Sequence, residues 1–235
     1  MEDLTWLLDN PQLFAWSAVL AFFLPIPILN FFIFGWIVRL SRRYLTEKSF
    51  APPELGNLKN YFVSGIRFVL LKMIVFSPSI AVSSLAVIFM LPVFLNRNFS
   101  DVTPGFLVYH VFLALFLAAG AAISFVLLLL IFPVCFFRFA EGDEFLWAVQ
   151  VKGILEDLNE MGFVYWEKFF ANLILTAACF VIIIFVYVFV KLMGFRYFIP
   201  EIAAGYLACF FFLLFIFLLI RSIGDLYSEL HYHYK

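Results

Sequence analysis

The sequence predicts an all-α, polytopic helical membrane protein that forms a single integral membrane domain over residues 1–235. Hydrophobic residues make up 66% of the chain and charged residues only 13%. About a quarter of a soluble domain is charged, and a soluble fold of this length could not bury so much apolar surface. The apolar residues also fall into long runs separated by short polar stretches, which is typical of membrane-spanning helices.

About five runs are long enough to be transmembrane helices, since a spanning helix needs about 20 residues. They cover residues 13–40, 73–95, 106–137, 169–193 and 202–220. Amphipathic segments at residues 58–72 and 145–160 are expected to form two interfacial helices on the cytoplasmic surface. In the second of them an apolar stripe is formed by Trp147, Val151, Ile154 and Leu158. Asp157 and Glu160 are expected on its opposite, solvated side.

The first run is interrupted near its middle by Pro25 and Pro27, which remove backbone hydrogen-bond donors. Asn30 can bond the freed carbonyls where protein covers them. We expect a single kinked and tilted helix over residues 13–40, with a re-entrant helical hairpin as the alternative. The candidate residues of a pathway through the membrane are Pro25, Pro27, Asn30, Asn172 and Thr176.

Basic residues predict the orientation. Twelve of the 15 Lys and Arg residues follow the first and third spans or lie in the C-terminal tail, including the cytoplasmic basic cluster of Arg39, Arg42 and Arg43. The positive-inside rule places this side in the cytoplasm. We therefore expect a multi-pass protein of the prokaryotic cytoplasmic (inner) membrane with a cytoplasmic C-terminus. The N-terminus lies outside if there are five spans, and inside if the first run is a hairpin.

Two features of the third run are candidates for binding. A helix-packing seam is predicted at the small residues Ala118, Ala119, Gly120, Ala121 and Ala122, where another helix could approach closely. His110 is a candidate cofactor ligand, because a histidine inside a membrane is often functional. Its shallow depth favours a hydrogen bond to the neighbouring loop instead. No cofactor is predicted, while a bound lipid or pigment stays open.

The sequence contains no recognised catalytic motif, such as a phosphate-binding glycine loop or a His-Glu-x-x-His pair. We therefore expect no enzymatic activity, no catalytic residue and no metal site. The net charge of -1 argues against a nucleic-acid partner. The predicted function is that of an accessory or scaffold subunit, whose partners are the lipid bilayer and other membrane protein subunits. The alternative is a transporter, channel or lipid-handling membrane protein.

Three stretches resemble a family of prokaryotic membrane proteins known as domain of unknown function 4013. They are FLPIPILNFFIFGWIVRLSRR, PPELGNLKNYFVSGIRFVL and RFAEGDEFLWAVQVKGILEDLNEMGFVYW. Gly35-Trp36 stands where the family usually has Gly-Tyr, and LGNLKN lacks the aspartates often seen there. The resemblance implies a multi-span helical membrane protein and implies no activity.

Overall fold

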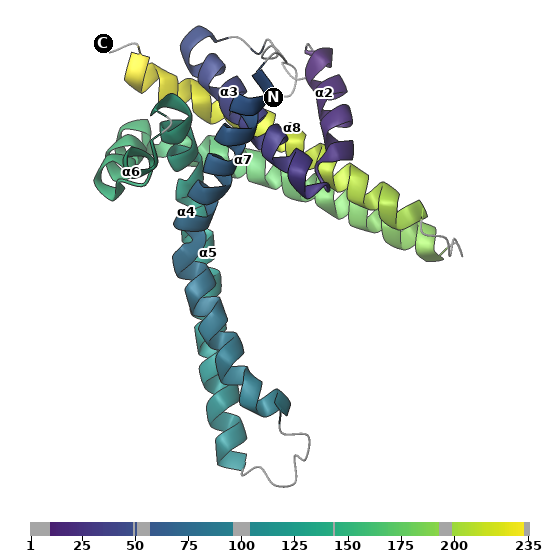
Figure 1. The fold of residues 1–235 in the computed structure, drawn as a ribbon. Coiled ribbons are helices and arrows are strands. Elements are labelled where there is room, and N and C mark those ends of the chain that lie inside the picture. Colours follow the sequence, from purple (N-terminus) through teal and green to yellow (C-terminus); the bar gives the residue numbers. More distant parts are fainter. Residues whose placement is uncertain are drawn as a thin grey trace. The chain divides into compact units, whose positions relative to one another are not determined.

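The computed structural model describes residues 10–48, 50, 57–95, 104–142, 144–192 and 199–232. These residues form seven helices and no strand (Figure 1). The helices are α2 (Pro11–Phe23), α3 (Pro27–Glu47), α4 (Leu58–Leu95), α5 (Pro104–Gly142), α6 (Phe145–Ala148), α7 (Val151–Leu192) and α8 (Ile199–Tyr232). Four of them, α4, α5, α7 and α8, are long and apolar enough to cross a membrane. The predicted class, an all-α polytopic membrane protein, is confirmed.

The chain divides into two compact units. Unit 1 consists of Met1–Val69 and Val134–Lys235, and unit 2 is Leu70–Pro133. Helices α4 and α5 contribute to both units.

The proline-broken run is two helices that fold back on each other, so the expectation of one kinked helix over 13–40 is wrong. The rings of Trp16 in α2 and Trp36 in α3 lie only 5.9 Å apart between centroids. In a continuous helix these residues would be about 30 Å apart at 1.5 Å per residue. The run is therefore the helical hairpin that stood as the alternative (Figure 1).

The sequence of the turn explains the break between α2 and α3. Pro27 disfavours helical geometry at the residue before it, and Ile26 is accordingly extended, with φ -86° and ψ 112°. Pro25 has no backbone N–H to continue the first helix. The amide of Leu24 still bonds the carbonyl of Leu20, so α2 is hydrogen-bonded up to the residue before Pro25.

Helix α8 is the centre of unit 1, because α2, α3 and α7 all pack on it. Its largest fully buried side chains are Leu213, Phe217, Ile220, Ile223 and Tyr227. In lipid, helices are held together by close packing rather than by the removal of apolar surface from water. The long apolar faces that stay exposed, such as Val181 and Phe185 on α7 at 64% and 70%, are suited to contact lipid.

The contacts with α8 fix the direction of each neighbour. Helix α2 runs antiparallel to it, since Phe14 contacts Phe210 while the Tyr206 hydroxyl donates to the carbonyl of Ala18. Helix α3 runs parallel to it, since Trp36 packs on Phe217 and Tyr44 reaches Asp225. The start of α2, the end of α3 and the end of α8 therefore point the same way.

The boundary between the second interfacial segment and the fourth span is a glycine. Gly162 has φ 58° and ψ -147°, so α7 comprises two helical segments joined by a kink at this residue. Such a backbone conformation is strained for any residue with a Cβ. The segment 145–160, expected to be interfacial, thus forms the short α6 and the first segment of α7, and the second segment of α7, which carries the apolar run, begins directly after Gly162.

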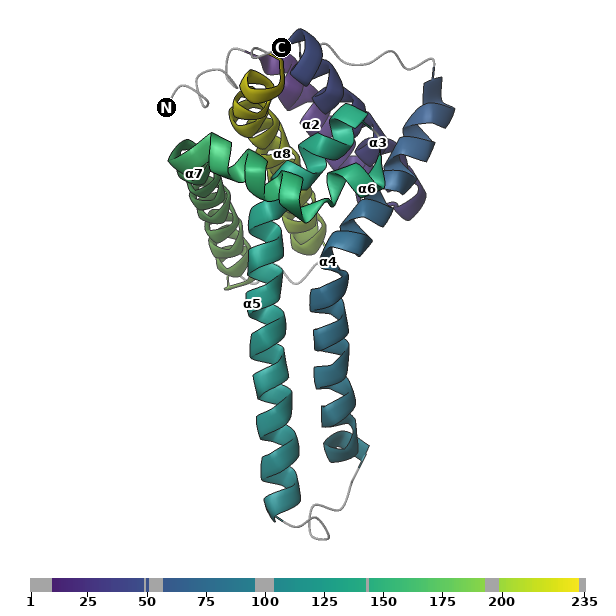
Figure 2. The ribbon, with the colours of Figure 1, turned by 90° about the vertical axis from the view of Figure 1, so that its left-hand side faces the viewer.

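Unit 2 is an antiparallel pair formed by parts of α4 and α5 (Figure 2). The Ser79 hydroxyl donates to the carbonyl of Ala121 at 3.0 Å, and Phe76 packs on Phe125 and Phe132. Helix α4 has 38 residues without interruption, about 57 Å at 1.5 Å per residue. That exceeds the hydrocarbon thickness of about 30 Å, so part of α4 extends beyond the membrane.

The hairpin predicts that both chain termini lie on one side of the membrane. We expect epitope tags at the two termini to be digested together by protease in vesicles of one orientation. A third tag inserted between Leu95 and Pro104 should be protected in the same vesicles, because α4 crosses once. Digestion of the two terminal tags in vesicles of opposite orientation would show that residues 13–40 span once.

Candidate functional site

Helices α3 and α4 touch through their backbones at two glycines. A Cβ added at Gly35 would lie 1.7 Å from the carbonyl oxygen of Tyr61, and one added at Gly65 would lie 1.7 Å from that of Phe31. Nothing larger than glycine fits at either position without moving a helix. This crossing joins the first two sequence stretches described above, and it belongs to unit 1.

Beyond this crossing, unit 1 has a cluster of polar side chains that we call the polar end. It is made up of Arg42 and Tyr44 (α3), Lys48 (directly after α3), Arg138 and Glu141 (α5), Asp157, Lys168 and Asn172 (α7), and Ser222, Asp225, Tyr227, Ser228 and His231 (α8). These residues come from four helices distant in sequence, and each bonds at least one other element. The polar end is the candidate functional site.

The most buried charges of the polar end are Arg138 and Asp157. Their side chains are 5% and 10% exposed, and Nη1 of Arg138 lies 2.8 Å from Oδ2 of Asp157. Arg138 also donates from Nε to the carbonyl of Trp147 at 3.0 Å, and its guanidinium carbon lies 4.3 Å from the Trp147 ring centroid. A Cβ at Gly153 would lie 2.5 Å from the guanidinium, so this glycine leaves the space for it.

Asp157 lies on the buried face of α7, so the expectation that it lies on the solvated side is wrong. It is 7% exposed and shares the buried face with Ile154 and Leu158, whereas Val151 is 68% exposed. The pairing with Arg138 explains this, because a buried carboxylate needs an opposite charge beside it. Nε2 of His231 lies 3.7 Å from the other oxygen, Oδ1, of the same carboxylate.

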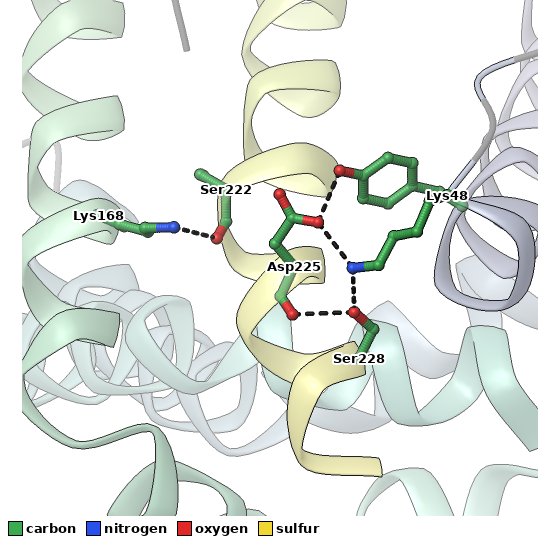
Figure 3. Close-up of polar contacts among 6 residues, drawn as sticks. Lys48, Lys168, Ser222, Asp225 and Ser228 are labelled. Carbon is green, nitrogen blue, oxygen red and sulfur yellow. Dashed lines mark hydrogen bonds and ion pairs between the residues drawn. The ribbon is translucent and has the colours of Figure 1, made fainter. Parts of the chain in front are cut away.

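A second group of contacts fastens the end of α3 to α8 (Figure 3). The ammonium of Lys48 donates to Asp225 at 2.7 Å and to the hydroxyl of Ser228, and the Tyr44 hydroxyl donates to Asp225 at 2.8 Å. A lysine beside a serine can serve as a general base, but the ammonium of Lys48 is already engaged in an ion pair with Asp225. Ser228 is 1% exposed and donates to the carbonyl of Asp225, so it is poorly placed for attack on a substrate.

A third group of contacts joins α7 to α8, and Figure 3 shows the one between Lys168 and Ser222. Nδ2 of Asn172 lies 2.6 Å from the Ser222 hydroxyl, which itself donates to the carbonyl of Leu218. The ammonium of Lys168 reaches the Ser222 carbonyl at 3.3 Å. Asn172 is only 5% exposed, and its side-chain amide is hydrogen-bonded within the protein, as buried polar groups usually are.

Two more hydrogen bonds reach α5. Nε of Arg42 donates to the carbonyl of Ala140 at 2.6 Å, and the Tyr227 hydroxyl donates to Glu141 at 3.0 Å. Tyr227 also stacks between Phe137 and His231. Among the residues that the structure describes, no three His, Cys, Asp or Glu side chains are grouped so that they could hold a metal ion.

The structure separates the predicted pathway residues. Thr176 bonds the carbonyl of Asn172, and both lie on α7. Asn30 lies on α3 near the Pro25 turn, and the register of α3 on α8 places it about 16 Å along α8 from Ser222, the partner of Asn172. The Oδ1 atom of Asn30 is buried and has no partner among the described residues.

The other candidates lie on α5. Ala121 is buried against α4 at 5% exposure, while the remaining seam residues Ala118, Ala119, Gly120 and Ala122 are exposed. His110 bonds the carbonyl of Phe106, one turn earlier in its own helix. The neighbouring loop, to which a hydrogen bond is expected, lies outside the described residues. Its role as a ligand stays a prediction.

The apolar spans and the polar contacts between them define the chain as an integral membrane protein of the helical-bundle class. The family described as "Protein of unknown function (DUF4013)" matches residues 18–192, and the chain belongs to it. The resemblance read from the three stretches is thus confirmed. No curated protein and no solved structure matches the chain. The matched region ends before α8, which nevertheless supplies Asp225 and Tyr227 to the polar end.

Gly35→Ala should destabilise the protein by about 1–3 kcal/mol, because the added methyl overpacks a backbone contact. The lower melting temperature can be measured in detergent. Gly205→Ala is the matched control, since no atom lies within 4 Å of its Cβ position and alanine favours a helix. Equal melting temperatures of the two variants would contradict the close crossing.

Asp157→Asn should cost about 3–5 kcal/mol, because it leaves the charge of Arg138 buried without a counterion. Glu156→Gln is the neighbouring control, since its exposed pair with Lys152 contributes less than about 1 kcal/mol. Urea or thermal unfolding of both variants measures the difference. Asp157→Asn with unchanged stability would refute the structural role assigned to this carboxylate.

Proposed function

We propose that this membrane protein is a non-enzymatic accessory or scaffold subunit of a larger assembly in a cytoplasmic membrane, with its polar end in the cytoplasm. The observation that carries the proposal is that the charged groups at the polar end pair with one another. Arg138 with Asp157, and Lys48 with Asp225, pair across helices and thereby fasten them together. Groups held in this way position helices and are poorly placed to act on a substrate.

The exposed surface supports a role in contacts. Ala118 and Ala122 are one turn apart on the same face of α5, and both are exposed. Small side chains let a second helix approach closely, whereas lipid gains little contact from them. A helix of a partner subunit is therefore a suitable occupant of this face. The excess of Lys and Arg on the side of the polar end supports its cytoplasmic orientation.

The proposal is tested by purification in gentle detergent from native membranes, followed by mass spectrometry of the proteins that come along. We expect a fixed set of membrane subunits at constant ratio to this chain. A protein that elutes alone as a monodisperse monomer with bulk lipid would refute the accessory role.

The double variant Ala118→Leu with Ala122→Leu should lose those partners while the chain itself still accumulates, because both positions are exposed within unit 2. Ala203→Leu on α8 makes the same chemical change at another exposed position, and this variant should retain the co-purifying partners. Quantitative mass spectrometry of both preparations measures the outcome. Partner recovery that is identical in both would place the interface elsewhere than on α5.

A second candidate, a transporter or channel, is favoured by one observation. Oδ1 of Asn30 is a buried acceptor without a partner among the described residues, close to the break at Pro25. A polar atom of this kind beside a broken helix can line a path for a solute. Solute flux into vesicles that is lost in Asn30→Leu, with the fold intact, would favour this candidate.

A further inference from the structure

Arg39 differs from the cations next to it on α3. Its guanidinium carbon lies 5.5 Å from the centroid of the Tyr61 ring, across the crossing of α3 and α4. Its Nε atom is buried and has no hydrogen-bond partner among the described residues. A charged group held in this way lacks the acceptor that partial burial normally demands.

The neighbouring arginines do have acceptors. Nε of Arg42 donates to the carbonyl of Ala140, and Nε of Arg43 donates to Glu47. The side chain of Arg43 is 38% exposed and its pair lies within α3. The missing acceptor is thus a property of Arg39 and its surroundings rather than of every arginine in the basic cluster.

The first turns of α4, near the end of the crossing where Arg39 lies, carry a second cation and exposed apolar side chains. Contacts of Gly35 with Tyr61 and of Gly65 with Phe31 show that α3 and α4 run antiparallel, which brings Lys59 in the first turn of α4 to the same end as Arg39. Lys59 is exposed, and so are its apolar neighbours on α4, Leu58 at 55% and Val63 at 39%.

We propose that Arg39 binds the phosphate of an anionic phospholipid at the crossing of α3 and α4. The planar guanidinium matches two phosphate oxygens, so the lipid supplies the acceptor that Nε lacks. Lys59 adds positive charge for a headgroup with net negative charge. The exposed apolar side chains of α4 offer contact to the acyl chains, which a free phosphate ion does not have.

The test is lipid retention by the purified full-length chain. The protein is equilibrated in detergent with equal amounts of phosphatidylglycerol and phosphatidylcholine of identical acyl chains, and the bound lipid is counted by native mass spectrometry. The wild type should retain roughly tenfold more phosphatidylglycerol, as expected for a charge-assisted phosphate contact. Arg39→Gln should bring the ratio close to one, and Arg39→Lys should give an intermediate ratio because it keeps the charge without the planar fork.

Lys152→Gln is the matched control, because this lysine is 82% exposed and also lies on the side of the polar end. It should leave the ratio unchanged. Equal retention of the two lipids by the wild type would overturn the proposal even if Arg39→Gln fails to fold. An unchanged ratio in folded Arg39→Gln, or displacement of the lipid by inorganic phosphate at the same concentration, would overturn it as well.

Discussion

The buried ion pair of Arg138 and Asp157 is the constraint around which the polar end is arranged. A guanidinium at 5% exposure is stable only with an opposite charge and acceptors for its N–H groups. Trp147 supplies a carbonyl and a ring face, and Gly153 supplies the space. These requirements explain why α7 begins with a segment that lies against the end of α5. They also explain why a polar residue occupies the buried face of that segment.

The helices of unit 1 are held by two different kinds of contact. Toward the apolar ends they pack through aromatic rings, such as Trp36 on Phe217, and through the glycine crossing at Gly35. At the polar end they are joined by charges and hydroxyls, such as Lys48 with Asp225. Such a division suits a bilayer, because van der Waals packing operates in lipid while ion pairs form where water and headgroups begin. A protein built in this way presents an end joined by ion pairs and apolar sides to its surroundings.

The class of fold could be predicted from composition and from the lengths of the apolar runs, since both follow from the thickness of a bilayer. The break at Pro25 and Pro27 is also visible in the sequence, but the sequence does not decide between one kinked helix and the hairpin, because the contact of Trp16 with Trp36 depends on tertiary packing. The basic cluster was found from its charge. The partners of Lys48 and Tyr44 could not be found, since Asp225 lies far away in sequence and in a segment expected to be a polar tail. Asp157 was assigned to the solvated face because periodicity does not report the charge of a neighbouring helix.

The central claim is that the charges of the polar end fasten helices to one another. The most direct measurement is made on the double variant Arg138→Met with Asp157→Leu, which replaces the buried pair by apolar side chains. The account predicts a stability within about 1–2 kcal/mol of the wild type, since such replacements are often neutral or stabilising. It also predicts an unchanged set of co-purifying membrane subunits. A stably folded double variant that has lost those subunits would contradict the account, because the two charges would then act on a partner or a substrate.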